Sequence, residues 1–351
     1  MNPNIVKGLL ILLVIVDHND FARSVIPGFL LGFSFHVLGF LTLPFLRPAH
    51  TIDRRLGQYL FRLYHPFFVI TTVLALVVFF ISPVSATRQL SLWLLSLYSG
   101  NFSVLKESTH MSLLWYLPSF VTLVALRAVI EQAGPAGKRI ILLGLVALHP
   151  FIGLLAPRIQ DFLPLGLLPV LYAIPLCYFA AYVHDRLFER HSRVLGMLAS
   201  VALYGAVKYL QMRAHLPNEL GAAEVADYTH PFALLVNDLE AITGVWMIFQ
   251  LGRFPLGRLI EITGKFSLQV YCFHAFIAAI IYKTLSSQLG TFPSLSLFLM
   301  SITLTAILTV ILARFLTERP LFRHLMFPKS TGELMQAFRI LPFHPVQGHG
   351  N

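Results

Sequence analysis

Long runs of apolar residues, each close to twenty positions, recur along the chain with short polar segments between them. A helix needs about 20 apolar residues to cross the hydrocarbon core of a bilayer, so each run predicts one transmembrane helix. A membrane barrel is disfavoured because the runs do not alternate apolar and polar residues. The predicted spans cover residues 4–20, 26–46, 60–82, 113–131, 139–157, 162–184, 194–211, 230–251, 266–285 and 293–316.

The composition excludes an ordinary soluble enzyme and a disordered chain. Of the 351 residues, 56% are hydrophobic and only 12% are charged, whereas soluble domains carry about 25% charged residues. Backbone polar groups in lipid must be satisfied within the spanning segment, which leaves helices as the spanning elements. We therefore expect an all-α, polytopic membrane helix bundle of about ten transmembrane helices.

Basic residues are distributed unevenly between the two sides of the predicted bundle. Most of the 26 Lys and Arg residues fall in segments that share a side with the two termini, and cytoplasmic loops are the ones enriched in Lys and Arg. Both termini should therefore be cytoplasmic, and the net charge of +10 reflects basic loops. We expect one integral-membrane domain over 1–316 and a cytoplasmic C-terminal tail over 317–351, with the largest external segments at 83–112 and 212–229.

Several ionisable residues recur at similar depth inside the predicted spans. They are His18, His36, His149, His274, Asp238 and Glu240. An ionisable side chain at the centre of a span costs about 2.5–3.5 kcal/mol on insertion scales, so each one suggests a function and a partner. A single histidine of this kind is more often structural and bonded to a backbone carbonyl, as we expect for His149 beside Pro150.

The spacing of Lys7 and His18 places them on one helix face. They are eleven residues apart, close to three full turns, so the imidazole lies about 16 Å deeper than the amine. Ser267, Tyr271 and His274 also share a face, at spacings of four and three. The hydroxyl groups of that face are placed to orient the imidazole, although core packing explains Tyr271 equally well.

Arg55 and Arg62 lie seven residues apart at the cytoplasmic end of the third predicted span. Two arginines on one face suit bidentate phosphate contacts. Simple determination of topology by basic residues explains the pair as well.

Sequence signatures of soluble enzymes are absent. The chain has no G-x-S-x-G elbow, no phosphate loop, no His-Glu-x-x-His and no dinucleotide fingerprint. Cys177 and Cys272 lie inside apolar runs, so we expect neither a disulfide nor a metal site. The basic residues that neighbour aromatic residues flank spans, so nucleic acid is not an expected partner.

Four short motifs stand in order between residues 7 and 274. They are Lys7-Gly8 with an aliphatic run to His18, then Phe35-His36, then Trp115-Tyr116-Leu117, and finally Gly264-x-x-Ser267-Leu268-x-x-Tyr271-x-x-His274. In this order they resemble the motifs of the membrane acyltransferase 3 family, in its fucose 4-O-acetylase-like branch. The second motif departs from that family in Val37-Leu38-Gly39, where Met-Pro-Leu is usual.

The resemblance implies that 1–316 is an acyltransferase domain in the bacterial inner membrane. The implied reaction moves an acyl group, most often acetyl, from cytoplasmic acyl-CoA to a hydroxyl of a cell-surface or exported glycan. Acyl-CoA would be the co-substrate, with its phosphates bound by Lys7, Arg55 and Arg62. Polysaccharide-assembly proteins are expected as further partners, and no metal cofactor is expected.

The resemblance also implies roles for the intramembrane residues. His18 would take the proton of the acceptor hydroxyl, and His274 would be a second proton carrier or an oxyanion donor, oriented by Tyr271. Further residues are expected at the glycan or lipid-linked sugar acceptor: His36, Asp238, Glu240 and Trp115.

Two other functions fit the same residues. Buried carboxylates at Asp238 and Glu240 suit a proton-coupled transporter or flippase of an anionic solute or a lipid-linked glycan. Paired intramembrane histidines are also the ligands of haem b.

Overall fold

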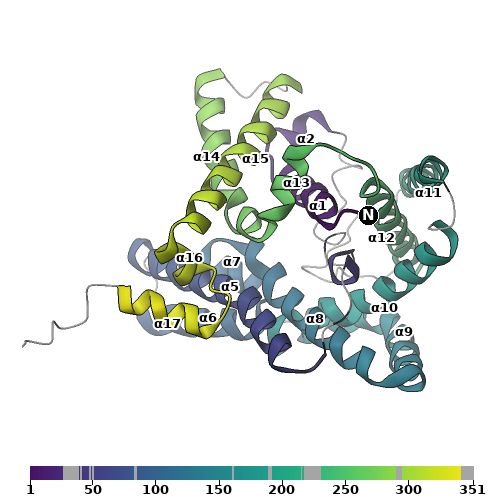
Figure 1. Ribbon diagram of the computed structural model, residues 1–351, viewed down its shortest axis with the longest axis horizontal. Coiled ribbons are helices and arrows are strands. Elements are labelled where there is room, and N and C mark those ends of the chain that lie inside the picture. Colours follow the sequence, from purple (N-terminus) through teal and green to yellow (C-terminus); the bar gives the residue numbers. More distant parts are fainter. Residues whose placement is uncertain are drawn as a thin grey trace, which may run out of the picture.

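A computed structural model describes residues 1–26, 39, 42–46, 49, 51–82, 85–159, 162–188, 192–214, 216, 231–289 and 295–340. These residues form helices and short helical turns, and none of them forms a strand (Figure 1). The helices are α1 (Pro3–Asp17), α2 (Ala22–Val25), α5 (Arg54–Ile81), α6 (Ala86–Ser99), α7 (Phe102–Thr109), α8 (Tyr116–Gln132), α9 (Gly134–Ile159), α10 (Leu167–Val183), α11 (Arg193–Arg213), α12 (Pro231–Leu251), α13 (Arg258–Lys265), α14 (Ser267–Leu289), α15 (Leu295–Glu318), α16 (Pro320–Met326) and α17 (Thr331–Ile340). The predicted all-α architecture is confirmed.

In the described part of the chain, 8 helices are long and apolar enough to cross a membrane. They are α5, α8 with the turn before it, α9, α10, α11, α12, α14 and α15, and they correspond to the third through tenth predicted spans. The protein is therefore a multi-pass membrane protein, and large apolar side chains such as Phe80, Leu143 and Leu198 are exposed on its surface, as a lipid environment favours. The first predicted span is the 15-residue helix α1, and most of the second, 26–46, lies outside the described residues.

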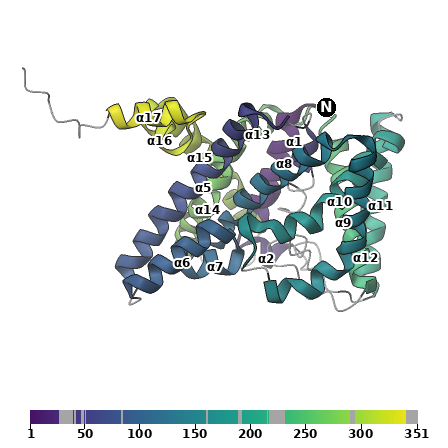
Figure 2. The ribbon, with the colours of Figure 1, turned by 90° about the horizontal axis from the view of Figure 1, so that it is seen from below.

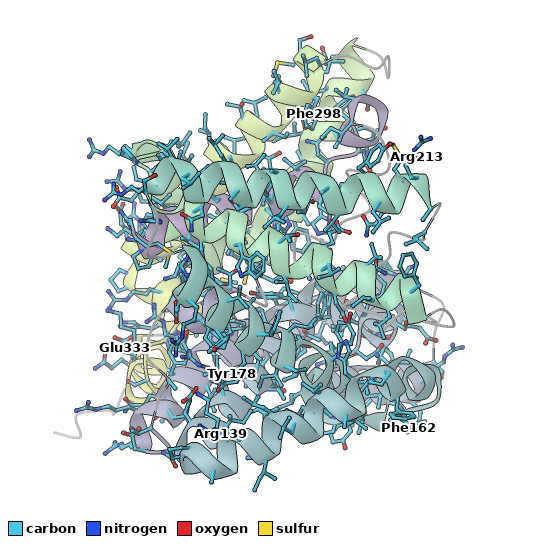
Figure 3. All side chains as sticks on the ribbon, turned by 90° about the vertical axis from the view of Figure 1, so that its right-hand side faces the viewer. Arg139, Phe162, Tyr178, Arg213, Phe298 and Glu333 are labelled. Carbon is cyan, nitrogen blue, oxygen red and sulfur yellow. The ribbon has the colours of Figure 1, made fainter. Side chains whose placement is uncertain are left out.

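The N-terminus and the C-terminal helices lie at the same end of the bundle. Figure 2 shows the N-terminus, α16 and α17 at one end, with α2 toward the other. In Figure 3, Arg139 and Glu333 lie at one end of the molecule and Phe162 and Arg213 at the opposite end. These positions agree with the predicted alternation of the loops between two sides, and the bias of basic residues predicts that the first end is cytoplasmic.

The predicted external segment 83–112 contains two short helices, α6 and α7. The Ser85 side chain accepts the backbone N–H of Arg88 at the start of α6 (3.4 Å), and the Asn101 side chain accepts that of Ser103 at the start of α7 (2.8 Å). Gly100 separates the helices with φ +60°, a left-handed conformation that favours glycine. Both helices are shorter than a membrane span and polar at their ends, so apolar length does not predict them.

Helix α1 lies inside the bundle, in contact with α12, α13, α14 and α15, and Figure 1 shows it nearly end-on among them. Its contact with α13 is close because glycines lie at the crossing. A Cβ added to Gly264 would overlap the carbonyl oxygen of Asn4, and a Cβ added to Gly8 would overlap that of Ile260. The glycines of the first and last motifs therefore allow the two backbones to meet.

Candidate functional site

A cavity of about 380 Å³ lies between α1, α5, α8 and the junction of α13 with α14. Three cationic side chains line it: Lys7 of α1, Arg62 of α5 and Lys265 at the end of α13. We call it the cationic cavity. None of the described residues that line it is acidic. The lining therefore favours an anionic ligand.

The α1 wall of the cationic cavity is a single helical stripe. Asn4, Lys7, Ile11 and Val14 line it at spacings of three and four residues. The next position on the stripe is His18, which follows the end of α1 and whose backbone N–H donates to the carbonyl of Val14 (3.1 Å). The predicted face that joins Lys7 to His18 is thus present, but the cavity ends about one turn before the histidine.

Helix α14 contributes a similar stripe to the lining of the cavity. Ser267 and Tyr271 line the cavity, and His274 lies one turn further along the same helix and outside the lining. The Tyr271 phenol donates a hydrogen bond to the carbonyl of Leu113, and its ring centroid lies 5.1 Å from that of Tyr116. Tyr271 therefore forms the floor of the cavity and joins the last motif to the central one.

His18 and His274 meet behind this floor. Their ring centroids are 5.3 Å apart and their planes are tilted by 36°, while the Tyr271 ring centroid lies 5.8 Å from that of His274. His274 is fully buried, and His18 is partly exposed. The first and last motifs therefore supply an imidazole pair next to the cationic cavity.

The hydrogen bond of His274 defines which ring nitrogen carries the proton. Its Nδ1 lies 2.7 Å from the carbonyl oxygen of Tyr271, and a carbonyl oxygen only accepts, so Nδ1 is the donor. The lone pair of the neutral ring then lies on Nε2, which has no hydrogen-bond partner among the described residues. A neutral imidazole in this state accepts a proton at Nε2.

The backbone leaves helical geometry at the imidazole pair. Helix α1 ends at Asp17, and the buried Asn19 then donates to the Ser301 hydroxyl of α15 (2.8 Å) and accepts the backbone N–H of Phe21 (3.0 Å). Irregular backbone at membrane depth requires protein partners of this kind. This polar turn explains why α1 is shorter than the predicted span 4–20.

Arg55, the third predicted phosphate ligand, does not line the cavity. It is exposed in the first turn of α5, which is capped by Asp53. The Asp53 carboxylate accepts the backbone N–H groups of Leu56 (3.0 Å) and Arg55 (2.8 Å). These hydrogen bonds, with that from Leu56 foremost, lower the pKa of Asp53. Capping thus fixes the start of the helix that carries Arg62.

Of the two aromatic motifs, the structure describes Trp115-Tyr116-Leu117 but not Phe35-His36. Trp115 is buried beside the cavity wall, with its ring 6.0 Å from that of Tyr116, whereas Tyr116 and Leu117 line the cavity themselves. The prediction for His36 falls outside the described residues.

Asp238 of α12 belongs to a polar cluster away from the cationic cavity. It accepts a hydrogen bond from the Tyr172 hydroxyl of α10 (2.6 Å), and its other oxygen lies 3.0 Å from Nε2 of His149 on α9. We predicted that His149 bonds a backbone carbonyl. That prediction is wrong for Nε2, which lies beside the Asp238 carboxylate of a neighbouring helix.

Glu240 of α12 belongs to a second cluster, formed with α11. Its fully buried carboxylate forms an ion pair with Lys208 and accepts a hydrogen bond from Gln211. Gln211 also donates to the Asn237 side chain (3.0 Å). Neither Glu240 nor Asp238 is among the residues that line the cationic cavity.

Three residues of the cationic cavity and the α12 clusters were not predicted from the sequence: Tyr116, Lys208 and Lys265. Lys265 follows Gly264 inside the last motif, and Tyr116 stands inside the central motif, so motif position was the available signal for both. Lys208 lies within a predicted span, where a lysine requires a partner. The identity of that partner follows only from the packing of α11 on α12.

No protein-family model, curated protein or solved structure matches this chain. Its fold and site nevertheless define a class: a multi-pass, all-helical membrane protein in which a cationic cavity ends beside a buried imidazole pair.

Proposed function

We propose that the chain is an integral-membrane O-acyltransferase of the membrane acyltransferase 3 type, acting in the inner membrane of a bacterium. It would move an acyl group, with acetyl as the first choice, from cytoplasmic acyl-CoA to a hydroxyl of a cell-surface or exported glycan. One observation carries the proposal: the motifs at 7–18, 115–117 and 264–274 converge on one cationic cavity with an imidazole pair behind its floor.

The chemistry of the cavity supports acyl-CoA as the donor. Lys7, Arg62 and Lys265 offer charge for the phosphate groups. Apolar residues such as Leu10 and Phe120 make up much of the remaining lining and suit the pantetheine arm with its acyl group. The volume of about 380 Å³ falls within the range of small-molecule sites.

In the proposed reaction, the neutral His18 imidazole removes the proton of the acceptor hydroxyl while the oxygen attacks the thioester carbonyl. The new C–O bond forms, the C–S bond breaks, and the CoA thiolate leaves with the proton returned to it. The lone pair on Nε2 of His274 supports the proton-carrier role for this residue over the oxyanion-donor role, which would require a protonated ring.

The α12 clusters favour supporting roles for the two carboxylates predicted at the acceptor. Glu240 is neutralised by Lys208, so in this proposal it holds α11 against α12. Asp238 orients His149 through a hydrogen bond. These pairs are also the observation that favours the second candidate, a proton-coupled transporter or flippase. Haem is less well supported, because a haem ligated by His18 and His274 would have to lie between two rings that are in contact.

Acetyl-CoA turnover by the purified protein in detergent tests the proposal. Without a membrane gradient, an acyltransferase releases CoA and forms a labelled acetyl ester on a glycan acceptor, whereas a transporter does neither. The acceptor to supply is identified by mass spectrometry of surface polysaccharide from cells with and without the gene, as the species that loses an acyl mass.

A pair of matched variants tests the role of His18. His18→Asn should lose turnover, whereas His110→Asn should retain it, because His110 also follows the end of a helix but is exposed and outside the cavity lining. Parental turnover in His18→Asn would remove the base assignment. Uptake of a solute into vesicles with no ester product would support the transporter instead.

A further inference from the structure

A second cavity, of about 720 Å³, lies at the cytoplasmic end of the bundle, between the inner ends of α8, α10, α11 and α12. Three arginines line it: Arg127, Arg193 and Arg253. His184 adds an imidazole, and Leu46 lines both this arginine cavity and the cationic cavity. None of these arginines was singled out from the sequence except as part of the general cytoplasmic bias.

Neutral groups contact each of the three guanidinium groups. Arg127 lies over the Phe45 ring, 4.4 Å from its centroid, and donates to the carbonyl of Pro44. Arg253 donates to the side-chain oxygen of Gln250 (2.9 Å), and Arg193 donates to the backbone carbonyl of Arg253 (3.3 Å). Each of these bonds uses one of the five N–H donors of an arginine and leaves its charge in place.

Two described acidic side chains lie near these arginines. Asp185 is the one carboxylate among the described residues that line the arginine cavity, and its side chain is 70% exposed and lies 3.4 Å from His184. Lys138, at the same end of the bundle, is paired with Glu131 at 2.8 Å, and the Glu131 carboxylate also attracts Arg127. The described lining therefore combines three arginines with one aspartate.

We propose that the arginine cavity binds the phosphate groups of an anionic ligand. The planar fork of arginine matches two oxygens of one phosphate, and three such forks suit a ligand with more than one phosphate or a phosphodiester headgroup. Two sources supply this chemistry at the inner membrane surface. One is the nucleotide end of a soluble donor, and the other is an anionic phospholipid of the adjoining leaflet, for which basic pockets between helices are typical.

Binding measurements on the full chain test the site without reference to acyl transfer. In neutral detergent, adenosine 3′,5′-bisphosphate is titrated calorimetrically into the parent, Arg193→Gln and Arg253→Gln. Arg258→Gln is the matched control, because Arg258 is an exposed arginine at the same end that lines neither cavity. In nanodiscs that contain phosphatidylglycerol, native mass spectrometry counts the lipid retained by the same proteins.

The proposal expects one of the two probes to bind the parent and to lose about tenfold or more in affinity or retention in the cavity variants but not in the control. Loss of bisphosphate binding identifies the soluble source, and loss of retained phosphatidylglycerol identifies the lipid. Arg193→Lys keeps the positive charge but not the planar guanidinium, so its loss of binding should be intermediate. This variant also tests the site if Arg253→Gln does not fold. If neither probe binds, or if all variants bind as the control does, the proposal is wrong.

Discussion

His274 offers a substitution that separates its structural hydrogen bond from its proposed chemistry. In His274→Asn, the side-chain amide nitrogen takes the place of Nδ1 and keeps the donation to the Tyr271 carbonyl, which is 2.7 Å long in the parent. No atom of asparagine reaches the position of Nε2. The variant therefore removes the proposed proton acceptor and retains the bond that orients the side chain.

The expected loss of turnover follows from the size of general acid–base effects. Proton transfer by a positioned side chain contributes about 10²–10⁴ in rate, equivalent to about 2.7–5.5 kcal/mol of activation free energy. The folded state loses only part of one fully buried ring, so the cost in unfolding free energy should be about 1–2 kcal/mol. The melting temperature should fall by only a few degrees.

Acetyl-CoA turnover and thermal unfolding in detergent measure the two effects separately. We expect kcat to fall at least about 100-fold, with KM for acetyl-CoA unchanged because His274 is not among the residues that line the cationic cavity. Turnover close to the parental rate in a folded His274→Asn would refute proton acceptance at Nε2. A rise in KM with unchanged kcat would place His274 in donor binding instead.

Three further substitutions test the cavity, the helix crossing and the buried ion pair. Arg62→Gln should raise KM for acetyl-CoA more than Arg55→Gln in initial-rate assays, because only the first of these arginines lines the cavity. Gly264→Ala should lower the unfolding free energy by about 1–3 kcal/mol in thermal scans, because its Cβ would overlap α1. Glu240→Gln should cost about 3–5 kcal/mol in the same scans, because it leaves a buried lysine without its carboxylate.

Matched controls decide these outcomes. Gly144→Ala should leave the melting temperature unchanged or raised, because nothing lies within 4 Å of its added Cβ. Glu107→Gln removes an exposed ion pair with Arg88 and should cost no more than about 1 kcal/mol. Equal losses in Gly264→Ala and Gly144→Ala would contradict the close crossing, and equal losses in Glu240→Gln and Glu107→Gln would contradict a buried ion pair.

The sequence determined the architecture because lipid restricts the options so strongly. A long apolar run in a bilayer must form a helix to satisfy its backbone, so the spans that became α5, α8, α9 and the later long helices were predictable in their order along the chain. Helices α6 and α7 escaped the same reasoning because they depend on capping and on packing rather than on apolar length. Periodicity also fixed the stripe from Lys7 to His18, since both residues lie along one element.

Tertiary structure decided which of these elements meet. Sequence gives the depth of a polar residue but not its direction around the bundle, so residues predicted at one depth fall into separate groups: His18 lies against His274, Asp238 holds His149, and Glu240 holds Lys208. Helix neighbours are chosen by packing, as at the crossing of Gly8 and Gly264. The close approach that packing allows there, between segments far apart in the chain, is what places the imidazole pair beside the cationic cavity.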